Sequence, residues 1–239
     1  MAQIRLDRFI SNQTGLSRNE AKEMLKSLRV CVNGKTEKNY DCKINTDSDM
    51  VTLDGEPIEY NQHIYILINK PSGVLTATED KRQSTVLDLI PQNLKRKKLS
   101  PVGRLDKDTT GLLILTDDGN FSHRVISPKS NIEKEYIAEL DGDVTDEMVQ
   151  KFSFGVTLAD GTECMPAKLK RVGFNTASIT ISEGKYHQIK RMFGTVGLGV
   201  NSLKRIRIGN LLLPDNLKTG EFVVLDFDTV FKEILNNNV

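Results

Sequence analysis

Residues 103 to 119 constrain the fold more strongly than any other stretch of this chain. The second half of this stretch contains Leu112 to Leu115, a continuous apolar run between Gly111 and the turn signal Asp118-Gly119. An apolar run of this length, bounded by turn residues, predicts a short strand buried on both faces. The first half is polar and rich in ionisable groups, so it predicts a loop that leads into the buried strand.

Arg104 and Asp106 stand in this polar half, two positions apart. In extended backbone the two side chains would point to the same side. Catalytic groups are often carried by loops on a rigid scaffold, so a carboxylate beside a cation marks a candidate site. A surface ion pair with ordinary turn chemistry accounts for the spacing equally well.

The composition predicts a folded, cytoplasmic protein. Charged residues make up 27% and hydrophobic residues 38% of the chain, and the net charge of +1 means that affinity for nucleic acid must come from local patches. The three cysteines have no CxxC spacing and the three histidines are scattered, so neither a disulfide framework nor a metal site is suggested. No apolar run is long enough for a membrane span or a signal peptide, so no membrane partner is expected.

The first part of the chain predicts a small module of two helices and several short strands. Ser17-Arg-Asn-Glu20 is a capping box, and it precedes a segment with an apolar face. Residues 30 to 34 and 49 to 55 each predict a strand that runs into a turn. The residues expected on the buried face of the second helix are Ala21, Met24, Leu25 and Leu28.

Basic residues are concentrated in the helical part of this module, whereas its strand part is acidic. One basic face on a small module suggests a surface that follows RNA phosphates. A solvated pair of helices explains the same distribution. The candidate RNA-binding residues are Arg5, Arg8, Arg18, Lys22 and Arg29.

Residues 56 to 63 are polar, contain a proline and show no periodicity, so the domain boundary is expected there, with domains at 1–59 and 60–239. Strand patterns outnumber helix patterns in the second domain, and their connections are too short for repeated βαβ crossovers. We therefore expect an α+β fold with a mixed, largely antiparallel sheet and flanking helices. The expected strands lie at 64–68, 133–140, 167–172, 177–182, 203–208 and 221–227.

Residues 184 to 193 interrupt this pattern with the periodicity of a helix. Tyr186, Ile189 and Phe193 would share one face, and His187, Lys190 and Arg191 would share another. A lone histidine is usually structural, but the neighbouring Gln188 and the cations favour a role toward a site. The stretch from 185 to 207 has no acid, so its cations predict an anionic polymer as partner: Lys185, Lys190, Arg191, Lys204, Arg205 and Arg207.

Three motifs in order resemble those of pseudouridine synthases. They are Gly103-Arg-Leu-Asp106 with the strand that follows it, Glu133-Lys-Glu-Tyr136, and Glu183 to Phe193. Residues 4 to about 55 resemble the S4 RNA-binding module, and this order of modules matches the RsuA subfamily over essentially the full chain. Many relatives carry arginine where this chain has Lys190. The lysine keeps the positive charge but lacks the bidentate geometry of a guanidinium.

The resemblance implies that a uridine within RNA is isomerised: the N1–C1′ bond breaks, the uracil turns, and C5 joins C1′. It implies no metal and no cofactor. Asp106 would be the catalytic carboxylate, as nucleophile or base, with Lys190 favouring its ionised form and Tyr136 against the target base. Arg104, Thr110, His187, Gln188 and Arg191 would bind the substrate, and Arg104 would hold RNA as the uridine flips out.

Within the subfamily, the motifs look most like those of enzymes acting on small-subunit (16S) ribosomal RNA at a site of the uridine-516 type. A large-subunit (23S) target is the alternative, and the partner would be ribosomal RNA or an assembling ribosomal subunit. We expect the protein to be a monomer.

Two other classes compete with this interpretation. A ribosome-assembly factor that binds RNA without catalysis would use the basic surfaces but would not need Asp106, Tyr136 and Lys190. A magnesium site for phosphoryl transfer would need convergence of Asp106, Asp108, Asp117 and Asp118. Since Asp117 and Asp118 follow the buried strand, they are expected at its far end.

Overall fold

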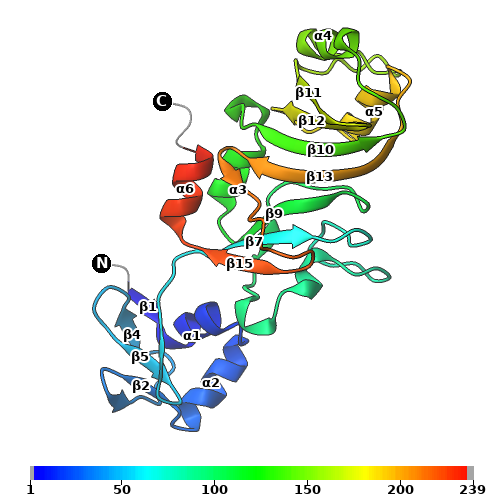
Figure 1. Cartoon of the computed structure of the whole chain (residues 1–239). Helices are drawn as coiled ribbons and strands as arrows, with labels where there is room; N and C mark the ends of the chain where they lie inside the picture. The colour runs from blue at the N-terminus through cyan, green and yellow to red at the C-terminus, as the bar shows by residue number, and fades with distance from the viewer. Residues whose placement is uncertain (1–2, 236–239) are drawn as a thin grey trace. The chain divides into compact units, whose positions relative to one another are not determined.

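The computed structural model describes residues 3–235, which form two compact units. Unit 1 comprises Met1–His63 and Leu87–Leu99, and unit 2 comprises Ile64–Val86 and Ser100–Val239. Figure 1 colours the chain from its N-terminal to its C-terminal end. No helix within residues 3–235 is both long enough and apolar enough to cross a bilayer.

Unit 1 consists of two helices, a four-stranded antiparallel sheet of order β3-β2-β5-β6 and a separate pair, β1-β4. Its apolar core joins both helices to strands β2, β4 and β5. The elements are β1 (Gln3–Arg5), α1 (Leu6–Thr14), α2 (Arg18–Lys26), β2 (Val30–Val32), β3 (Lys35–Thr36), β4 (Lys43–Asn45), β5 (Val51–Leu53), β6 (Glu56–Ile58) and the 3-10 helix η2 (Gln92–Leu94).

Helix α2 begins where the capping box predicts. The Ser17 hydroxyl accepts from the Glu20 amide, and the Glu20 carboxylate accepts from the Ser17 amide, so two of the unpaired amides at the helix start are satisfied. The expected apolar face was wrong at Leu28. Because the helix ends at Lys26 and Leu28 adopts a left-handed backbone, its side chain lies 59% exposed instead of in the core.

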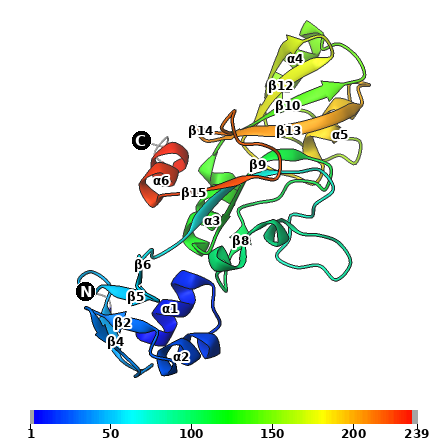
Figure 2. The ribbon, with the colours of Figure 1, turned by 60° about the horizontal axis from the view of Figure 1, so that its bottom comes forward.

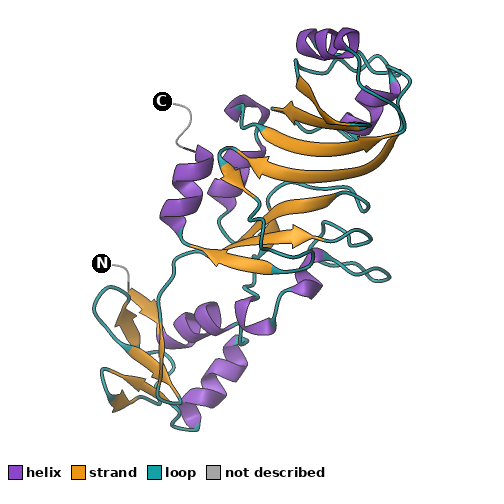
Figure 3. Ribbon diagram, in the orientation of Figure 1, coloured by secondary structure: helices purple, strands orange, loops and turns teal. Residues whose placement is uncertain are grey.

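Unit 2 is built on one nine-stranded sheet whose main path is β11-β12-β10-β13-β9-β7-β15 (Figures 1 and 3). All pairings are antiparallel except β13 with β9, which confirms the mixed, largely antiparallel sheet. The strands are β7 (Tyr65–Lys70), β8 (Ser100–Pro101), β9 (Thr110–Thr116), β10 (Lys134–Leu140), β11 (Lys168–Gly173), β12 (Thr176–Ile181), β13 (Val200–Ile208), β14 (Leu211–Leu212) and β15 (Phe222–Leu225).

The buried strand predicted after Asp106 is β9, and Leu112 to Leu115 are all 0% exposed. Gly111 lets its backbone approach β13 closely. Its φ is +98°, and a Cβ there would lie 2.2 Å from the Arg205 carbonyl oxygen. Only glycine fits this position without moving a backbone.

Helices α3 (Gly119–Ile126) and α6 (Phe227–Leu235) cover the core around β7 and β9. Figure 2 shows α3 below β9 and α6 at the C-terminal end of the described chain, beyond β15. Asp118 caps α3 by accepting from the amides of Asn120 and Phe121, and Thr145 caps α4 (Asp146–Phe154) by accepting from the Met148 amide. At the β11–β12 end, α4 packs against α5 (Gln188–Gly194) through the rings of Phe152 and Phe193, with centroids 5.3 Å apart.

The helix predicted over 184–193 is shorter than its periodicity indicates. Residues 185–187 form a turn, and α5 starts only at Gln188 because His187 has a left-handed backbone, with φ +47°. Ile189 and Phe193 are buried, but Tyr186 lies before the helix and is 76% exposed. The expectation that Tyr186 shares a helix face with Ile189 and Phe193 was therefore wrong.

Candidate active site

Asp106 lies in the loop that enters β9. Its side chain is 29% exposed, and its main-chain carbonyl accepts a hydrogen bond of 3.1 Å from the Thr109 amide, which closes a tight turn. On the other side of the loop, the Thr76 hydroxyl donates to the Leu105 carbonyl at 2.7 Å and accepts from the Leu105 amide. The carboxylate is thus accessible to a ligand while its backbone is held by both neighbours.

Lys70, at the end of β7, is hydrogen-bonded to the main chain of the same loop. Its three N–H donors are shared among four main-chain carbonyls, those of Asp106, Lys107, Thr109 and Pro71, which lie 2.9 to 3.1 Å from Nζ, and the residue is 0% exposed. Burial lowers the pKa of Lys70 to about 8, although the charges of Asp108 and Asp106 act in the opposite direction. The loop therefore rests on a buried cation.

His187 brings an imidazole to this carboxylate. Its Nε2 atom lies 3.5 Å from the Oδ1 atom of Asp106, and both side chains are about one third exposed. This contact places the imidazole beside the carboxylate. A role of His187 in the site remains a prediction.

Lys190 forms its ion pair with Asp108. The ammonium lies 2.6 and 2.5 Å from the two carboxylate oxygens of Asp108, and its hydrogen bond holds the pKa of that carboxyl below its usual range. The first turn of α5 thus contacts the loop that carries Asp106, but the contact is made with Asp108 and not with Asp106. A role of Lys190 toward Asp106 remains a prediction.

Tyr136 lies on β10, directly opposite Arg205 of β13. Its hydroxyl accepts a hydrogen bond of 3.4 Å from the Arg205 guanidinium, which also donates to the Leu112 carbonyl at 2.7 Å. Arg205 is 4% exposed, and its Nη2 atom has no partner among the described residues. Since Arg205 pairs with Gly111, the sheet places Tyr136, Arg205 and the start of β9 in one band across three strands.

The other expected substrate-binding residues divide into accessible and structural ones. Arg104 is exposed and forms no ion pair within residues 3–235, so the surface ion pair with Asp106 is absent. The Thr110 hydroxyl is 3.5 Å from the Leu203 carbonyl. Gln188 is 4% exposed and binds Glu183 and the Lys185 amide, so it holds the turn before α5 together.

Arg191 has the same kind of anchoring role. Its guanidinium lies 2.5 Å from the Asp160 carboxylate and donates to the Tyr186 carbonyl at 3.3 Å. It therefore ties the turn before α5 to the segment that follows α4.

The cationic stretch 185–207 is largely neutralised by acids from other parts of unit 2. Lys185 pairs with Glu183, Lys190 with Asp108 and Arg191 with Asp160. Arg207 lies between Glu133 and Glu135, and Arg205 is buried. Most of these cations are therefore paired, and the acids that pair with Lys190, Arg191 and Arg207 are distant from them in sequence.

In unit 1, most of the candidate RNA-binding residues also have partners. Arg5 and Arg18 both bind the Asp7 carboxylate, which is 0% exposed, at 3.0 and 2.5 Å. Burial alone would raise the pKa of Asp7, but these hydrogen bonds outweigh it and hold the pKa below its usual range. Arg29 pairs with Asp54, Lys22 lies 4.8 Å from the centre of the Tyr40 ring, and Arg8 is exposed.

The carboxylates of the magnesium interpretation do not gather at one point. Asp106 and Asp108 precede β9, whereas Asp117 and Asp118 follow it, and the seven-residue strand separates them by roughly 20 Å. Asp118 instead caps α3 and accepts a hydrogen bond from the Tyr65 hydroxyl, and Asp117 accepts from the Ile64 amide.

Lys70 and Arg205 are the site-supporting residues that sequence reasoning missed. Lys70 ends an apolar strand just before the breaker-rich Pro71-Ser-Gly73, and a lysine at the inner end of a buried strand is the signal that could have found it. Arg205 was counted as one of several surface cations because alternation along β13 does not distinguish a buried guanidinium from an exposed one.

Comparison with known proteins identifies the family of this chain. Residues 64–195 match the family model for RNA pseudouridylate synthase. An RNA pseudouridine synthase of Bacillus subtilis is 40% identical over 223 residues, covering 92% of this chain and 93% of the relative. Ribosomal small subunit pseudouridine synthase A of Escherichia coli is 40% identical over 222 residues, covering 92% and 95%.

A crystal structure of a pseudouridylate synthase superposes with a TM-score of 0.68 and 34% identity, covering 97% of this chain and 100% of that one. The match extends over both units, and the three motifs predicted from the sequence fall on the loop before β9, on β10 and at the start of α5. The chain belongs to the RNA pseudouridylate synthase family and is an RNA pseudouridine synthase.

Proposed function

We propose that this chain converts one uridine of small-subunit (16S) ribosomal RNA, at a site of the uridine-516 type, to pseudouridine in the cytoplasm. The observation that carries the proposal is the Asp106 carboxylate, which is accessible, mounted on a clamped loop and faced by His187 at 3.5 Å. Relatives in Escherichia coli and Yersinia pestis, named ribosomal small subunit pseudouridine synthase A, are 40% and 41% identical to it and support this target.

In this proposal Asp106 acts on the flipped nucleotide, either as a nucleophile or as a base on the sugar. The N1–C1′ bond breaks, the uracil turns within the site, and C5 bonds to C1′ while the C5 proton is lost and N1 gains one. Tyr136 would lie against the base, and Arg205 would orient its hydroxyl. The clamped loop keeps the carboxylate in place while the uracil moves.

Unit 1 would act as an S4-like RNA-binding module, spanning the domain proposed at 1–59. Its two helices present Arg8 and Lys22 as exposed or weakly held cations, which are suited to phosphate. Arg5 and Arg18 would contribute from their positions around Asp7.

The test uses the purified full chain and 16S and 23S rRNA transcripts, with pseudouridine detected by chemical labelling and primer extension. We expect one new modification in 16S rRNA and none in 23S rRNA. D106N should bind the transcript with unchanged affinity and form no pseudouridine. Modification in 23S rRNA alone would overturn the target, and an active D106N variant would overturn the assignment of the carboxylate.

A further inference from the structure

Tyr186 and His187 form a stacked pair of rings beside the carboxylate of the active site. Their ring centroids are 4.0 Å apart and their planes differ by 15°. His187 faces Asp106, whereas Tyr186 is 76% exposed. Since the imidazole covers one face of the Tyr186 ring, the exposed area of this residue leaves the opposite face open.

The turn that carries the two rings is fixed by several contacts. The Tyr186 carbonyl accepts from Arg191, which is held by Asp160, and the Lys185 amide donates to the buried Gln188 side chain. His187 adopts a left-handed backbone, which is uncommon for a residue with a Cβ and concentrates at functional sites. The backbone that carries the exposed Tyr186 ring is thus anchored on both sides, and the ring itself stacks on His187.

We propose that the open face of Tyr186 is a stacking platform for an RNA base that neighbours the uridine held at Asp106. This inference rests on the proposed function. Single-stranded bases are recognised by stacking on aromatic side chains, and every base offers a face for this contact. Lys185, Lys190 and Arg191 are each paired with a carboxylate, so these cations are less available to bind RNA phosphates. This favours stacking as the contact that the turn makes with RNA.

A base stacked on Tyr186 would form a column of three rings with Tyr186 and His187. His187, at the inner end of this column, lies next to Asp106. Stacking would replace part of the interaction that the neighbouring base loses when the uridine leaves the RNA stack. The platform requires a flat ring at position 186 and does not require the phenol hydroxyl.

The first test compares Y186F with Y186L on the rRNA transcript that the wild-type protein modifies. Removal of one base-stacking side chain typically weakens binding about 5- to 100-fold. We expect Y186L to raise KM by such a factor with kcat changed less than about threefold, and Y186F to behave like the wild type. Equal impairment of both variants would assign the effect to the hydroxyl and overturn the platform.

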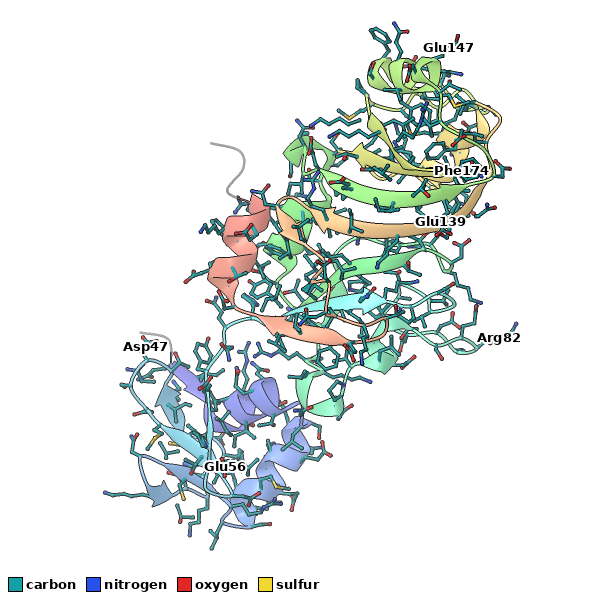
Figure 4. The ribbon with its side chains drawn as sticks, viewed as in Figure 1. Asp47, Glu56, Arg82, Glu139, Glu147 and Phe174 are labelled. Atoms are coloured by element: carbon teal, nitrogen blue, oxygen red, sulfur yellow. The ribbon has the colours of Figure 1, made fainter. Side chains whose placement is uncertain are left out.

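The second test uses fluorescence, because the chain contains no tryptophan. Y186W would supply a single reporter, which a stacked base should quench strongly when the transcript binds. The control is F174W in the turn between β11 and β12, where Phe174 is 84% exposed (Figure 4). Quenching of Y186W no greater than that of F174W would overturn the proposal. If the wild-type protein modifies no rRNA, the proposed function is wrong. That outcome differs from a failure of the platform, because the fluorescence test measures base stacking and not modification.

Discussion

The Nε2 atom of His187 lies 3.5 Å from the Oδ1 atom of Asp106, across the two loops that precede α5 and β9. Neither loop makes this contact through regular secondary structure. The Asp106 loop is set by Lys70 and Thr76, and the turn before α5 is set by Gln188 and Arg191. The relationship therefore depends on two independently anchored backbones.

Replacement of His187 by asparagine should separate its ring chemistry from its backbone conformation. Asparagine tolerates the left-handed region better than most residues, so H187N should keep the turn while removing the imidazole. We expect kcat at saturating RNA to fall about tenfold, equivalent to about 1.4 kcal/mol of barrier. H123N changes an exposed histidine of α3 and should retain the wild-type kcat. An H187N enzyme as fast as the wild type would show that the contact does not serve the reaction.

Lys190 and Asp108 can be tested as a pair. The Asp108 side chain is 67% exposed, so D108N should cost at most about 1 kcal/mol of stability. If Lys190 supports Asp106 during turnover, K190M should lower kcat at least tenfold both in the wild type and in D108N. Initial rates of the four proteins of this cycle give the coupling directly. Loss of the K190M effect in the D108N background would restrict Lys190 to its ion pair.

Glycine at position 111 should be required by the approach of β9 to β13. A Cβ there would lie 2.2 Å from the Arg205 carbonyl oxygen and 2.8 Å from its nitrogen, in addition to the strain of φ +98°. We expect G111A to lose more than about 3 kcal/mol in urea denaturation or to fail to fold.

The control for this prediction is G161A. Gly161 has φ +83° in the same unit, but a Cβ at this position would meet no atom within 4 Å, so only backbone strain remains. G161A should lose about 1 kcal/mol. Equal losses of stability in the two variants would remove the role assigned to the close approach of the strands.

Local patterns in the sequence predict local structure well. Leu112 to Leu115 and the Ser17 capping box are correct because their causes, apolar burial and side-chain capping, act over a few residues. Leu28 and Tyr186 are wrong because a helix end or start depends on one left-handed residue, which helical periodicity does not register. The α+β class follows from counting strands, whereas the single parallel pairing of β13 with β9 does not.

The candidate site is only partly predictable for a similar reason. The motif residues Asp106 and His187 lie 3.5 Å apart, a contact that the motifs do not specify, and ion pairs such as Lys190 with Asp108 join residues distant in sequence. Periodicity and composition contain no information about which acid reaches which cation. Leu87–Leu99 belongs to unit 1 although it lies within the sequence expected for the second domain. Sequence patterns do not predict this, because the packing of the segment in unit 1 forms only in the folded chain.

The buried ammonium of Lys70 should give stability a defined pH dependence. Its folded pKa of about 8 lies below the value of about 10.4 for an unfolded lysine. Between these pH values the unfolded chain binds a proton that the folded chain has released, so this residue makes the free energy of unfolding rise with pH. The same free energy in K70M should rise less steeply between pH 8 and pH 10.

The K70M substitution should also destabilise the protein, because four carbonyls lose their donor. A loss on the order of 2–4 kcal/mol is expected in urea denaturation at pH 7. The pH series is the more specific measurement, since any disruptive substitution lowers stability. A wild-type slope in K70M would show that the ammonium does not titrate in this window.

The basic residues of unit 1 make a prediction about salt dependence. Removal of one cation that binds a phosphate should reduce the slope of log affinity against log salt by about one unit. Among residues 3–235, Lys22 has the Tyr40 ring as its contact and forms no ion pair, so K22A tests a phosphate-binding cation without disturbing an ion pair there. Arg18 also stabilises the buried Asp7, so R18A should lower the stability of unit 1 as well as weaken RNA binding.

The decisive comparison is the double variant R18A/K22A against K35A, which removes an exposed lysine of β3. Filter binding of the rRNA transcript at several salt concentrations should give a slope flatter by about two units in the double variant and by less than one in K35A. Thermal unfolding of each variant separates weaker RNA binding from impaired folding. Because Asp7 still has Arg5 at 3.0 Å after R18A, most of the fold of unit 1 should survive, and the slope then reports binding to RNA phosphates. An unchanged slope in the folded double variant would mean that α2 faces solvent and that another surface binds the RNA.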